Sequence, residues 1–418
     1  TLIINNIVRE NKNFKERIKL KYLDELENNP LRVRDTIREY ITTFGATCQQ
    51  TQGKEIFKAK KRMLENKGNT RELYNQSRTY ENVLIDEAAR SNPPDLLIPM
   101  SMAKKRIILV GDHKQLPHLI DENILEYLKD EEGKKEGQDV KTFIEEQIKK
   151  SMFEKLKTSC EELEKYDGIK RVIMLNRQYR MHPKMGTFVS NHFYEGKLEN
   201  GLEADKFDNR LKGLEGKAFA WFDVSNKYSE EKKRKSYYRN IEAKEIAKFI
   251  YRNIDNEEAK GKNFGIITFY SSQRDEILKE LSNKKNKAYE GQDLIVIREN
   301  NSYRINDKYK YSTEEGIGEK IRIGSVDAFQ GMEFNFVCLS MVRSNKFPLD
   351  EKNIRNKFGF LTNRNRLCVA MSRQKELLVV FGDSKMLEGE KYTDVEVLQE
   401  YLKMCKEDGE YGKFESIL

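Results

Sequence analysis

Two apolar runs that end abruptly in polar residues constrain the fold of this chain more than any other feature. The run Val83–Ile85 ends in Asp86-Glu87, and the run Ile107–Val110 ends in Gly111-Asp112, with Gln115 about one helical turn later. An apolar run followed at once by carboxylates predicts a buried parallel strand that delivers acids to the carboxyl edge of a sheet. Open α/β sheets bind their ligands at that edge. The pattern therefore predicts an α/β fold with a phosphate-binding site there.

The polar residues at these two strand ends suit phosphoryl transfer. Asp86 is our candidate ligand for a Mg²⁺ ion, and Glu87 is our candidate base for the attacking water. Gln115 would sense the γ-phosphate and couple it to a second domain. A lone Asp-Glu pair after an apolar strand is more often an ordinary strand end, by roughly three to one. The second strand reverses those odds, because two strands then deliver polar groups to one edge.

A second α/β pattern begins near residue 170. Apolar strands that alternate with helices predict a mostly parallel, doubly wound sheet. We therefore expect two tandem domains, over residues 1–165 and 166–418, with helices before residue 40, a strand at Tyr40–Thr43, a solvated excursion at 121–150 and a β-hairpin around Asn300-Asn301. The expected strands of the second domain are Val172–Leu175, Phe219–Val224, Phe264–Phe269, Lys320–Val326, Phe336–Val342 and Leu377–Phe381, with helices at Ile241–Arg252 and Gln273–Leu281.

Length and composition permit two ordinary domains and a polyanionic partner. The 418 residues include 77 basic and 69 acidic side chains, a formal charge of +8, which allows nucleic-acid binding without demanding it. Five cysteines without metal-ligand spacing indicate the reduced thiols of a cytoplasmic protein. No apolar stretch approaches the roughly 20 residues of a membrane helix. Since the chain starts at Thr1, we expect a fragment of a longer protein.

Six blocks in order resemble the motifs of one family. They are Asp86–Ala89 (motif II), Gly111–Pro117 (motif III), Gln178–Pro183 (a tyrosine-arginine block), Gly265–Gln273 (motif IV), Ser325–Glu333 (motif V) and Leu367–Arg373 (motif VI). From about residue 40 to 385 the chain resembles a superfamily 1 helicase of the nonsense-mediated-decay and senataxin-like group. The resemblance implies two RecA-like P-loop NTPase domains, the first incomplete at its N-terminus. It also implies ATP and Mg²⁺ as cofactors, and single-stranded DNA or RNA as the partner.

The resemblance assigns roles around the nucleotide. Arg180 and Arg373 would reach the phosphates as arginine fingers, because planar guanidinium groups match the charge that spreads over phosphoryl oxygens. Glu333 would face the nucleotide sugar, Gly331 would line the nucleotide site, and Tyr179 would stack on the base. Taken alone, each arginine is an ordinary surface or helix residue, Glu333 a loop acid and Tyr179 a core residue.

The nucleic-acid contacts are expected at small polar residues whose alternative role is turn and cap chemistry. The resemblance carries the backbone contacts over to Thr47, Ser271, Ser325 and Gln330, and Arg343 would add to them. The basic run Lys232–Lys235 is most often a solvated loop. The segment from Tyr303 to Tyr311 interleaves aromatics with cations, as single-strand platforms do.

The chain departs from the family upstream. No Gly-x-x-x-x-Gly-Lys-Ser/Thr occurs in it, and Cys368 and Lys375 stand where asparagine and arginine are usual. Since the missing loop cradles the phosphates, we expect an ATP-dependent helicase or translocase, 5′→3′ as is usual in the family, that is inactive in this fragment alone. The alternatives are an ATPase switch triggered by nucleic acid without unwinding, and a scaffold that binds nucleic acid without hydrolysis.

Overall fold

The computed structural model describes residues 47–48, 80–116, 150–225, 230–283, 291–300, 302–312, 318–348, 353–389 and 391–417. They belong to two compact units, residues 1–83 with 94–106, and residues 84–93 with 107–418. The helices expected before residue 40, the strand at Tyr40–Thr43 and nearly all of the excursion at 121–150 lie outside the described residues. The domain boundary at 165 stays a prediction.

The two apolar runs form strands, as predicted. β1 (Tyr80–Ile85) and β2 (Ala103–Leu109) pair in a two-stranded sheet. The helix α6 (Pro93–Met100) connects them. Their expected burial is wrong: Leu84 is 64% exposed and Ile107 44% exposed. Two strands alone cannot bury both of their faces, and no third strand joins this sheet among the described residues.

A six-stranded, wholly parallel sheet organises the larger unit. Its strand order is β11-β8-β12-β13-β5-β14. The bounds are β5 Phe219–Asp223, β8 Phe264–Thr268, β11 Ile321–Ser325, β12 Phe334–Ser340, β13 Gln374–Gly382 and β14 Gly412–Ser416. Five of these were expected from the apolar runs, with shifted ends, whereas β14 was missed because Gly412–Ser416 contains only one large apolar residue. The predicted α/β fold is confirmed.

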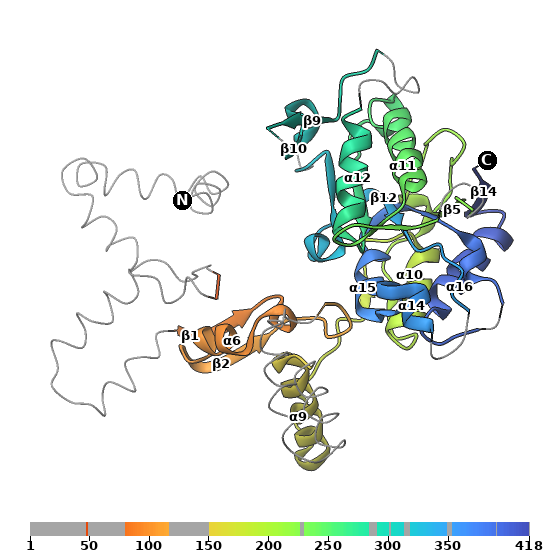
Figure 1. Ribbon diagram of the computed structural model, residues 1–418. Coiled ribbons are helices and arrows are strands. Elements are labelled where there is room, and N and C mark those ends of the chain that lie inside the picture. Colours follow the sequence, from red (N-terminus) through yellow and green to blue (C-terminus); the bar gives the residue numbers. More distant parts are fainter. Residues whose placement is uncertain are drawn as a thin grey trace, which may run out of the picture. The chain divides into compact units, whose positions relative to one another are not determined.

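Helices cover both faces of this sheet. Along β13, Leu377, Val379 and Phe381 face one core, and Leu378 and Val380 face the other, which is the period of two that a strand imposes. One core is closed by α11 (Asn240–Asn253) and α12 (Ser271–Leu281). The other is closed by α10 (Pro183–Phe193), α14 (Ile354–Phe358), α15 (Arg364–Ala370) and α16 (Glu396–Glu407), and Figure 1 shows these two helix groups on opposite sides of the strands.

Short elements decorate the sheet. The expected hairpin around Asn300 is confirmed as β9 (Val296–Glu299) and β10 (Ser302–Ile305). The chain then turns into α13 (Asp307–Lys310) instead of continuing as a strand, because the Asn306 side chain caps that helix. The remaining elements are η2 Ala88–Arg90, α9 Met152–Asp167, β3 Arg177–Gln178, β4 Glu199–Asn200, η3 Ala204–Lys206, β6 Lys232–Lys233, β7 Tyr237–Tyr238, η4 Glu257–Ala259, η6 Val326–Phe329, η7 Gly359–Thr362 and η8 Ser384–Leu387.

One predicted strand does not form. Val172–Leu175 lies in irregular chain between α9 and β3. Leu175 is 79% exposed and Ile173 72% exposed. An apolar run becomes a strand only where a neighbour supplies backbone partners, and the described residues offer none here. None of the described helices is long and apolar enough to cross a membrane.

Candidate nucleotide and nucleic-acid site

The two acids after β1 lie in a strained turn. Glu87 has φ 52° and ψ 35°, a left-handed conformation that is uncommon for residues other than glycine and is concentrated at functional sites. Its N–H donates to Oδ1 of Asp86 over 2.9 Å, and both side chains are exposed. A carboxylate exposed in this way suits Mg²⁺, which keeps several waters and takes few protein ligands.

The expected motif V loop contacts one of these acids, Glu87. Nε2 of Gln330 donates to Oε2 of Glu87 over 3.4 Å, while the buried Oε1 of Gln330 has no hydrogen-bond partner in the described part of the chain. Gly331 has φ 75°, and a Cβ there would lie 3.5 Å from Oε1 of Glu87. Glu87, Gln330 and Gly331 are therefore neighbours, although 243 residues separate Glu87 from Gln330.

A chain of hydrogen bonds orients Gln115. Oδ2 of Asp112 accepts from Nε2 of Gln115 (2.8 Å) and from the hydroxyl of Tyr194 (2.5 Å). That hydroxyl also lies 3.5 Å from Sγ of Cys368. Burial, followed by the charges of Cys368 and Asp112, raises the pKa of Tyr194, so the phenol keeps its proton and donates. Because Asp112 holds the amide nitrogen, the amide oxygen of Gln115 must face the other way.

The oxygen of Gln115 faces Arg373. This arginine is 2% exposed. Its Nη2 donates to Oε1 of Gln115 (3.3 Å) and Oγ of Ser372 (2.8 Å), and its Nε and Nη1 donate to the carbonyls of Val369 (3.0 Å) and Met332 (3.3 Å). Burial lowers the pKa of Arg373 to about 10, which leaves it charged at pH 7. These four acceptors are neutral, and among the described residues no carboxylate forms a hydrogen bond or ion pair with Arg373, although the charge of Glu87 opposes the lowering of its pKa.

Arg180 lies beside Arg373 but has an acidic partner. Its Nε donates to Oε2 of Glu333 (3.0 Å), and its Nη1 donates to the carbonyl of Ser372 (3.1 Å). Lys375 holds the other oxygen of Glu333 at 2.7 Å. Burial acts to raise the pKa of Glu333, but the bonds and charges of Lys375 and Arg180 outweigh it and lower the pKa. Glu333 therefore stays ionised between two cations.

The ring of Tyr179 is exposed and lies against a glycine. It is 61% exposed, which contradicts the alternative that it is a core residue. Its ring lies against Gly201, where a Cβ would come within 2.3 Å of Cε1 of the tyrosine. Gly201 is thus required for this ring position.

The residues predicted to bind nucleic acid do not all lie near the residues predicted to bind the nucleotide. Because every strand of the sheet is parallel, residues that follow strands lie at the carboxyl edge and residues that precede strands lie at the amino edge. Ser271 and Arg343 follow β8 and β12, whereas Glu333 and Arg373 immediately precede β12 and β13. Ser325 ends β11. Of these candidates, Gln330 contacts the nucleotide residue Glu87.

Arg343 does not favour the predicted contact with nucleic acid. It is 3% exposed. Its guanidinium pairs with Glu231 at 3.1 Å and lies 4.2 Å from the ring centroid of Tyr237. Thr47 is exposed, in a two-residue described segment. The idea of an aromatic platform at 303–311 is contradicted at Tyr309, which is fully buried and donates to Asp255 over 2.7 Å.

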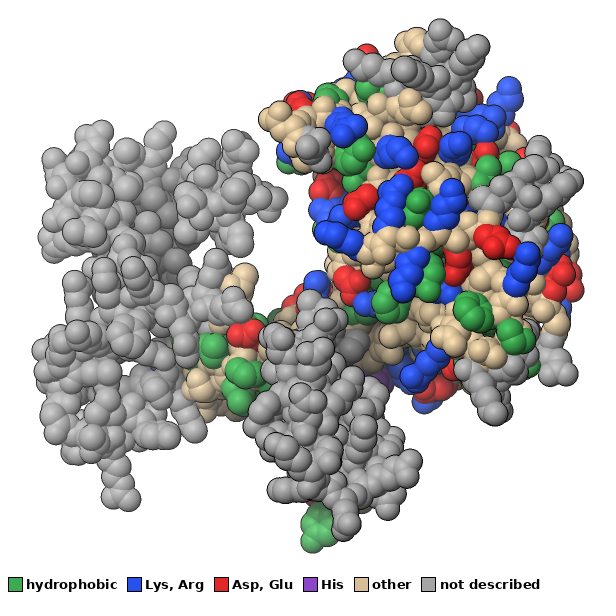
Figure 2. All heavy atoms as spheres, viewed as in Figure 1, with side chains coloured by type: hydrophobic (Ala, Val, Ile, Leu, Met, Phe, Trp, Pro, Cys, Tyr) green, Lys and Arg blue, Asp and Glu red, His purple; other side chains and the backbone are tan. Residues whose placement is uncertain are grey.

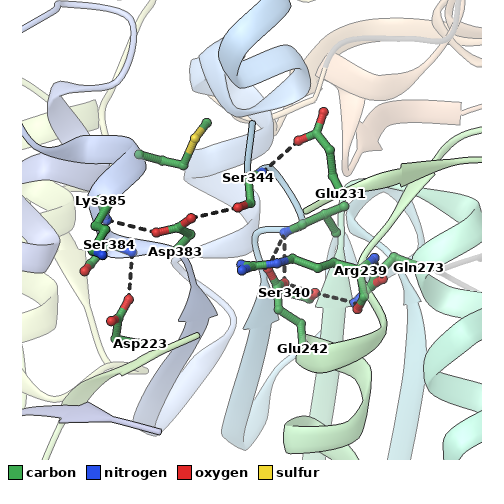
Figure 3. Close-up of polar contacts among 12 residues, drawn as sticks. Asp223, Glu231, Arg239, Glu242, Gln273, Ser340, Ser344, Asp383, Ser384 and Lys385 are labelled. Atoms are coloured by element: carbon green, nitrogen blue, oxygen red, sulfur yellow. Dashed lines mark hydrogen bonds and ion pairs between the residues drawn. The ribbon is translucent and has the colours of Figure 1, made fainter. Parts of the chain in front are cut away.

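A buried polar network holds the carboxyl edge together (Figure 3). Oγ of Ser340 donates to Glu242, and Nε2 of Gln273 donates to Oγ of Ser340. The N–H of Val342 also donates to Glu242, and Val342 has φ 70°, a strained value for a β-branched residue. Burial raises the pKa of Glu242, against the opposing effect of Arg239. The network thus holds a strained strand end in place.

Sequence reasoning missed Tyr194, Asn365 and the structural role of Asp112. The Asn365 side chain donates to the carbonyl of Gln115 over 2.6 Å and so fixes the backbone at that residue. Asp112 was visible as the acid of Gly-Asp, but Tyr194 carried no signal, since its partner is 82 residues away. Across the described residues no group of three or more His, Cys, Asp or Glu side chains forms a metal cluster.

Comparisons with known proteins identify the family of this chain. A family model described as an AAA domain matches residues 148–385, and a second AAA domain model matches residues 66–123. A regulator of nonsense transcripts 1 homolog from Neurospora crassa is 31% identical over 316 residues, which cover 74% of this chain and 23% of the relative. The ATP-dependent helicase NAM7 of Saccharomyces cerevisiae is 29% identical over 319 residues, 74% of this chain and 26% of the relative.

The parallel sheet and these matches define an α/β protein of the RecA-like helicase class. The chain belongs to the AAA domain family whose model covers more than half of it, and its resemblance to superfamily 1 helicases of the nonsense-mediated-decay group is confirmed by these relatives. It spans about a quarter of their length. The solved PRRSV helicase gives a TM-score of 0.30 at 12% identity, over 73% of this chain and 36% of that chain, too low to support an argument.

Proposed function

We propose that this chain is part of an ATP-dependent helicase or translocase that acts on single-stranded nucleic acid, in the 5′→3′ direction. The observation that carries the proposal is Arg373, a buried cation whose four hydrogen-bond acceptors are neutral. A buried charge needs compensation, and an anionic phosphate that reaches Gln115 and Arg373 together would supply it. The relatives named as ATP-dependent helicases support the same reading.

The neighbouring residues fit a nucleoside triphosphate with Mg²⁺. Asp86 would hold the ion, which neutralises charge on the phosphates. Glu87 would accept a proton from the attacking water. Gln115, whose amide oxygen accepts a hydrogen bond from Arg373, would lie near the γ-phosphate. Arg180 and Arg373 would stabilise the charge that develops on the phosphoryl oxygens. Tyr179, Gly331 and Glu333 would bind the base and sugar.

The nucleic-acid partner is proposed at the opposite, carboxyl edge of the sheet. Ser271 there is an exposed hydroxyl in the first turn of α12, a position suited to a phosphate. Thr47 and Ser325 stay candidates for further contacts, whereas Gln330, which contacts Glu87, stays a candidate beside the nucleotide residues and not at this edge. We also propose a cytoplasmic location, consistent with five free cysteines.

The deciding experiment measures ATP hydrolysis by the full-length protein, with and without single-stranded DNA and RNA, beside the Glu87→Gln variant. Stimulation by one polymer that is lost in Glu87→Gln supports the proposal and identifies the polymer. A strand-displacement assay then separates a helicase from an ATPase switch. Binding of nucleic acid without any hydrolysis would support the scaffold instead. Residues 1–418 alone, which contain no Gly-x-x-x-x-Gly-Lys-Ser/Thr loop, are expected to hydrolyse ATP negligibly.

A further inference from the structure

A basic hairpin lies at the carboxyl edge of the sheet and has no part in the residue assignments above. β6 and β7 pair antiparallel, with Lys232 opposite Tyr238 and Lys233 opposite Tyr237. The hairpin carries the run Lys232–Lys235, and all four of these side chains are exposed. The run is exposed, as a solvated loop would be, but it is not a plain loop, because Lys232-Lys233 belong to a strand of the hairpin and Arg234-Lys235 form its turn.

The hairpin is anchored to the start of α12. The N–H of Ser236 donates to Oγ of Ser272 (3.1 Å), and the N–H of Ser272 donates back to Oγ of Ser236 (2.8 Å). Oγ of Ser236 also lies 3.1 Å from Oγ of Ser271, the hydroxyl expected to contact a nucleic-acid backbone. After the hairpin, the N–H of Arg239 donates to Oε1 of Gln273 (2.7 Å), which belongs to the buried network of Figure 3.

Tyrosine rings support the cations. The guanidinium of Arg234 lies 4.0 Å from the ring centroid of Tyr238, and Nζ of Lys233 lies 5.6 Å from that of Tyr237. Both distances are within the range of cation–π attraction. Tyr238 is buried, so the platform beneath Arg234 is rigid. The basic groups are therefore presented outward from an ordered surface.

The three lysines of the hairpin, unlike its arginine, have no acidic partner among the described residues. Arg234 forms an ion pair with Glu276 at 3.1 Å. The acids nearest in sequence form ion pairs with other cations, Glu231 with Arg343 and Glu230 with Lys346. Within the described residues no ion pair involves Lys232, Lys233 or Lys235. On the face shown in Figure 2, Lys and Arg side chains also gather over α11 and α12, with acids between them.

We propose that the β6–β7 hairpin, together with the Ser271 hydroxyl, binds the phosphate backbone of the single-stranded nucleic acid. The inference rests on the proposed function, since it assigns a new binding surface for the same partner. Three exposed ammonium groups beside hydroxyls at a helix N-terminus form contacts that recognise phosphates without reading sequence. The hairpin would thus increase affinity for any sequence equally.

The test compares the full-length protein with a variant that replaces Lys232, Lys233 and Lys235 by Gln, using fluorescent oligo(dT) and oligo(U). Each phosphate contact in a single strand contributes roughly 0.7 to the slope of log K against log[salt]. Losing three contacts should lower the slope by about 2 and, at 0.1 M salt, weaken binding by up to roughly 100-fold. A variant with Arg at the same three positions should keep the slope. The charge-matched control is a variant with Gln at three exposed lysines outside the hairpin, Lys212, Lys403 and Lys406.

The outcomes separate this inference from the proposed function. If wild-type protein binds no oligonucleotide and its ATP hydrolysis does not respond to one, the proposed function fails. If wild-type protein binds and the Gln variant keeps both affinity and salt slope, the function stands and the hairpin inference is overturned. An equal loss in the control variant would also overturn it, because the effect would then come from net charge alone. Basal hydrolysis without nucleic acid should be the same in all these variants.

Discussion

The carboxylate of Asp112 is expected to set the direction in which the Gln115 amide points. It accepts three hydrogen bonds, from the Tyr194 hydroxyl (2.5 Å), Nε2 of Gln115 (2.8 Å) and the N–H of Lys114 (2.9 Å). A carboxylate is an acceptor only, so the amide nitrogen of Gln115 must turn towards it. In consequence the amide oxygen meets Arg373.

Asp112→Asn keeps the size of the side chain and removes this constraint. In this variant the side-chain oxygen at position 112 would accept from the N–H of Lys114. The new NH2 group would then face Nε2 of Gln115, so that two hydrogen-bond donors oppose each other. Gln115 would then turn over and point its own nitrogen at the Arg373 cation. Losing a hydrogen bond to a charged group costs about 1.5–3 kcal/mol. If that cost falls on the transition state, kcat for ATP hydrolysis drops about 10- to 150-fold, with little change in the KM for ATP.

Tyr194→Phe is the matched control. It removes one donor to Asp112 but keeps the carboxylate, so the Gln115 amide keeps its direction. We expect kcat within about fivefold of wild type and a fall of about 1–2 kcal/mol in the free energy of unfolding. Steady-state ATP hydrolysis by the full-length proteins, with saturating nucleic acid, gives kcat and KM separately. Wild-type kcat in Asp112→Asn, or an equal loss in Tyr194→Phe, would refute the reasoning.

Three further predictions concern neighbouring residues. Glu87→Gln should lower hydrolysis at least 100-fold yet leave ATP binding measurable by calorimetry; loss of binding would make Glu87 a ligand residue instead. Gly201→Ala should push the Tyr179 ring off its position, since the Cβ would lie 2.3 Å from it, and raise the KM for ATP without changing kcat; an unchanged KM would remove Tyr179 from the nucleotide site. The lowered pKa of Glu333 means that its stabilising contribution is present above its unfolded pKa of about 4.5 and is lost as pH falls through the lower folded value. Unfolding free energies of wild type and Glu333→Gln should therefore differ by a constant amount from pH 6 to 8 and converge in acid, and a difference that varies between pH 6 and 8 would contradict this.

Patterns local in sequence predicted most of the sheet. Strands such as Phe264–Thr268 are short apolar runs with clear ends, and α11 shows helical spacing, so the interactions that form them lie within a few residues. The positions of the acids after β1 and of Gly111-Asp112 after β2 were predicted from local patterns of the same kind. Val172–Leu175 shows the limit of such patterns, because an apolar run does not contain its own strand partner.

The sequence by itself determined the α/β fold class and most of the strands and helices of the larger unit, because periodicity is encoded locally, and its motif spacing proposed the residues for the nucleotide site. Only the tertiary structure decided what those residues contact. It buried Arg373 among neutral acceptors, tied Arg343 to Glu231 and linked Tyr194 to Asp112. These outcomes depend on side chains brought together across as many as 258 residues, and burial, charge pairing and hydrogen-bond direction arise only when the packed chain removes water from between them.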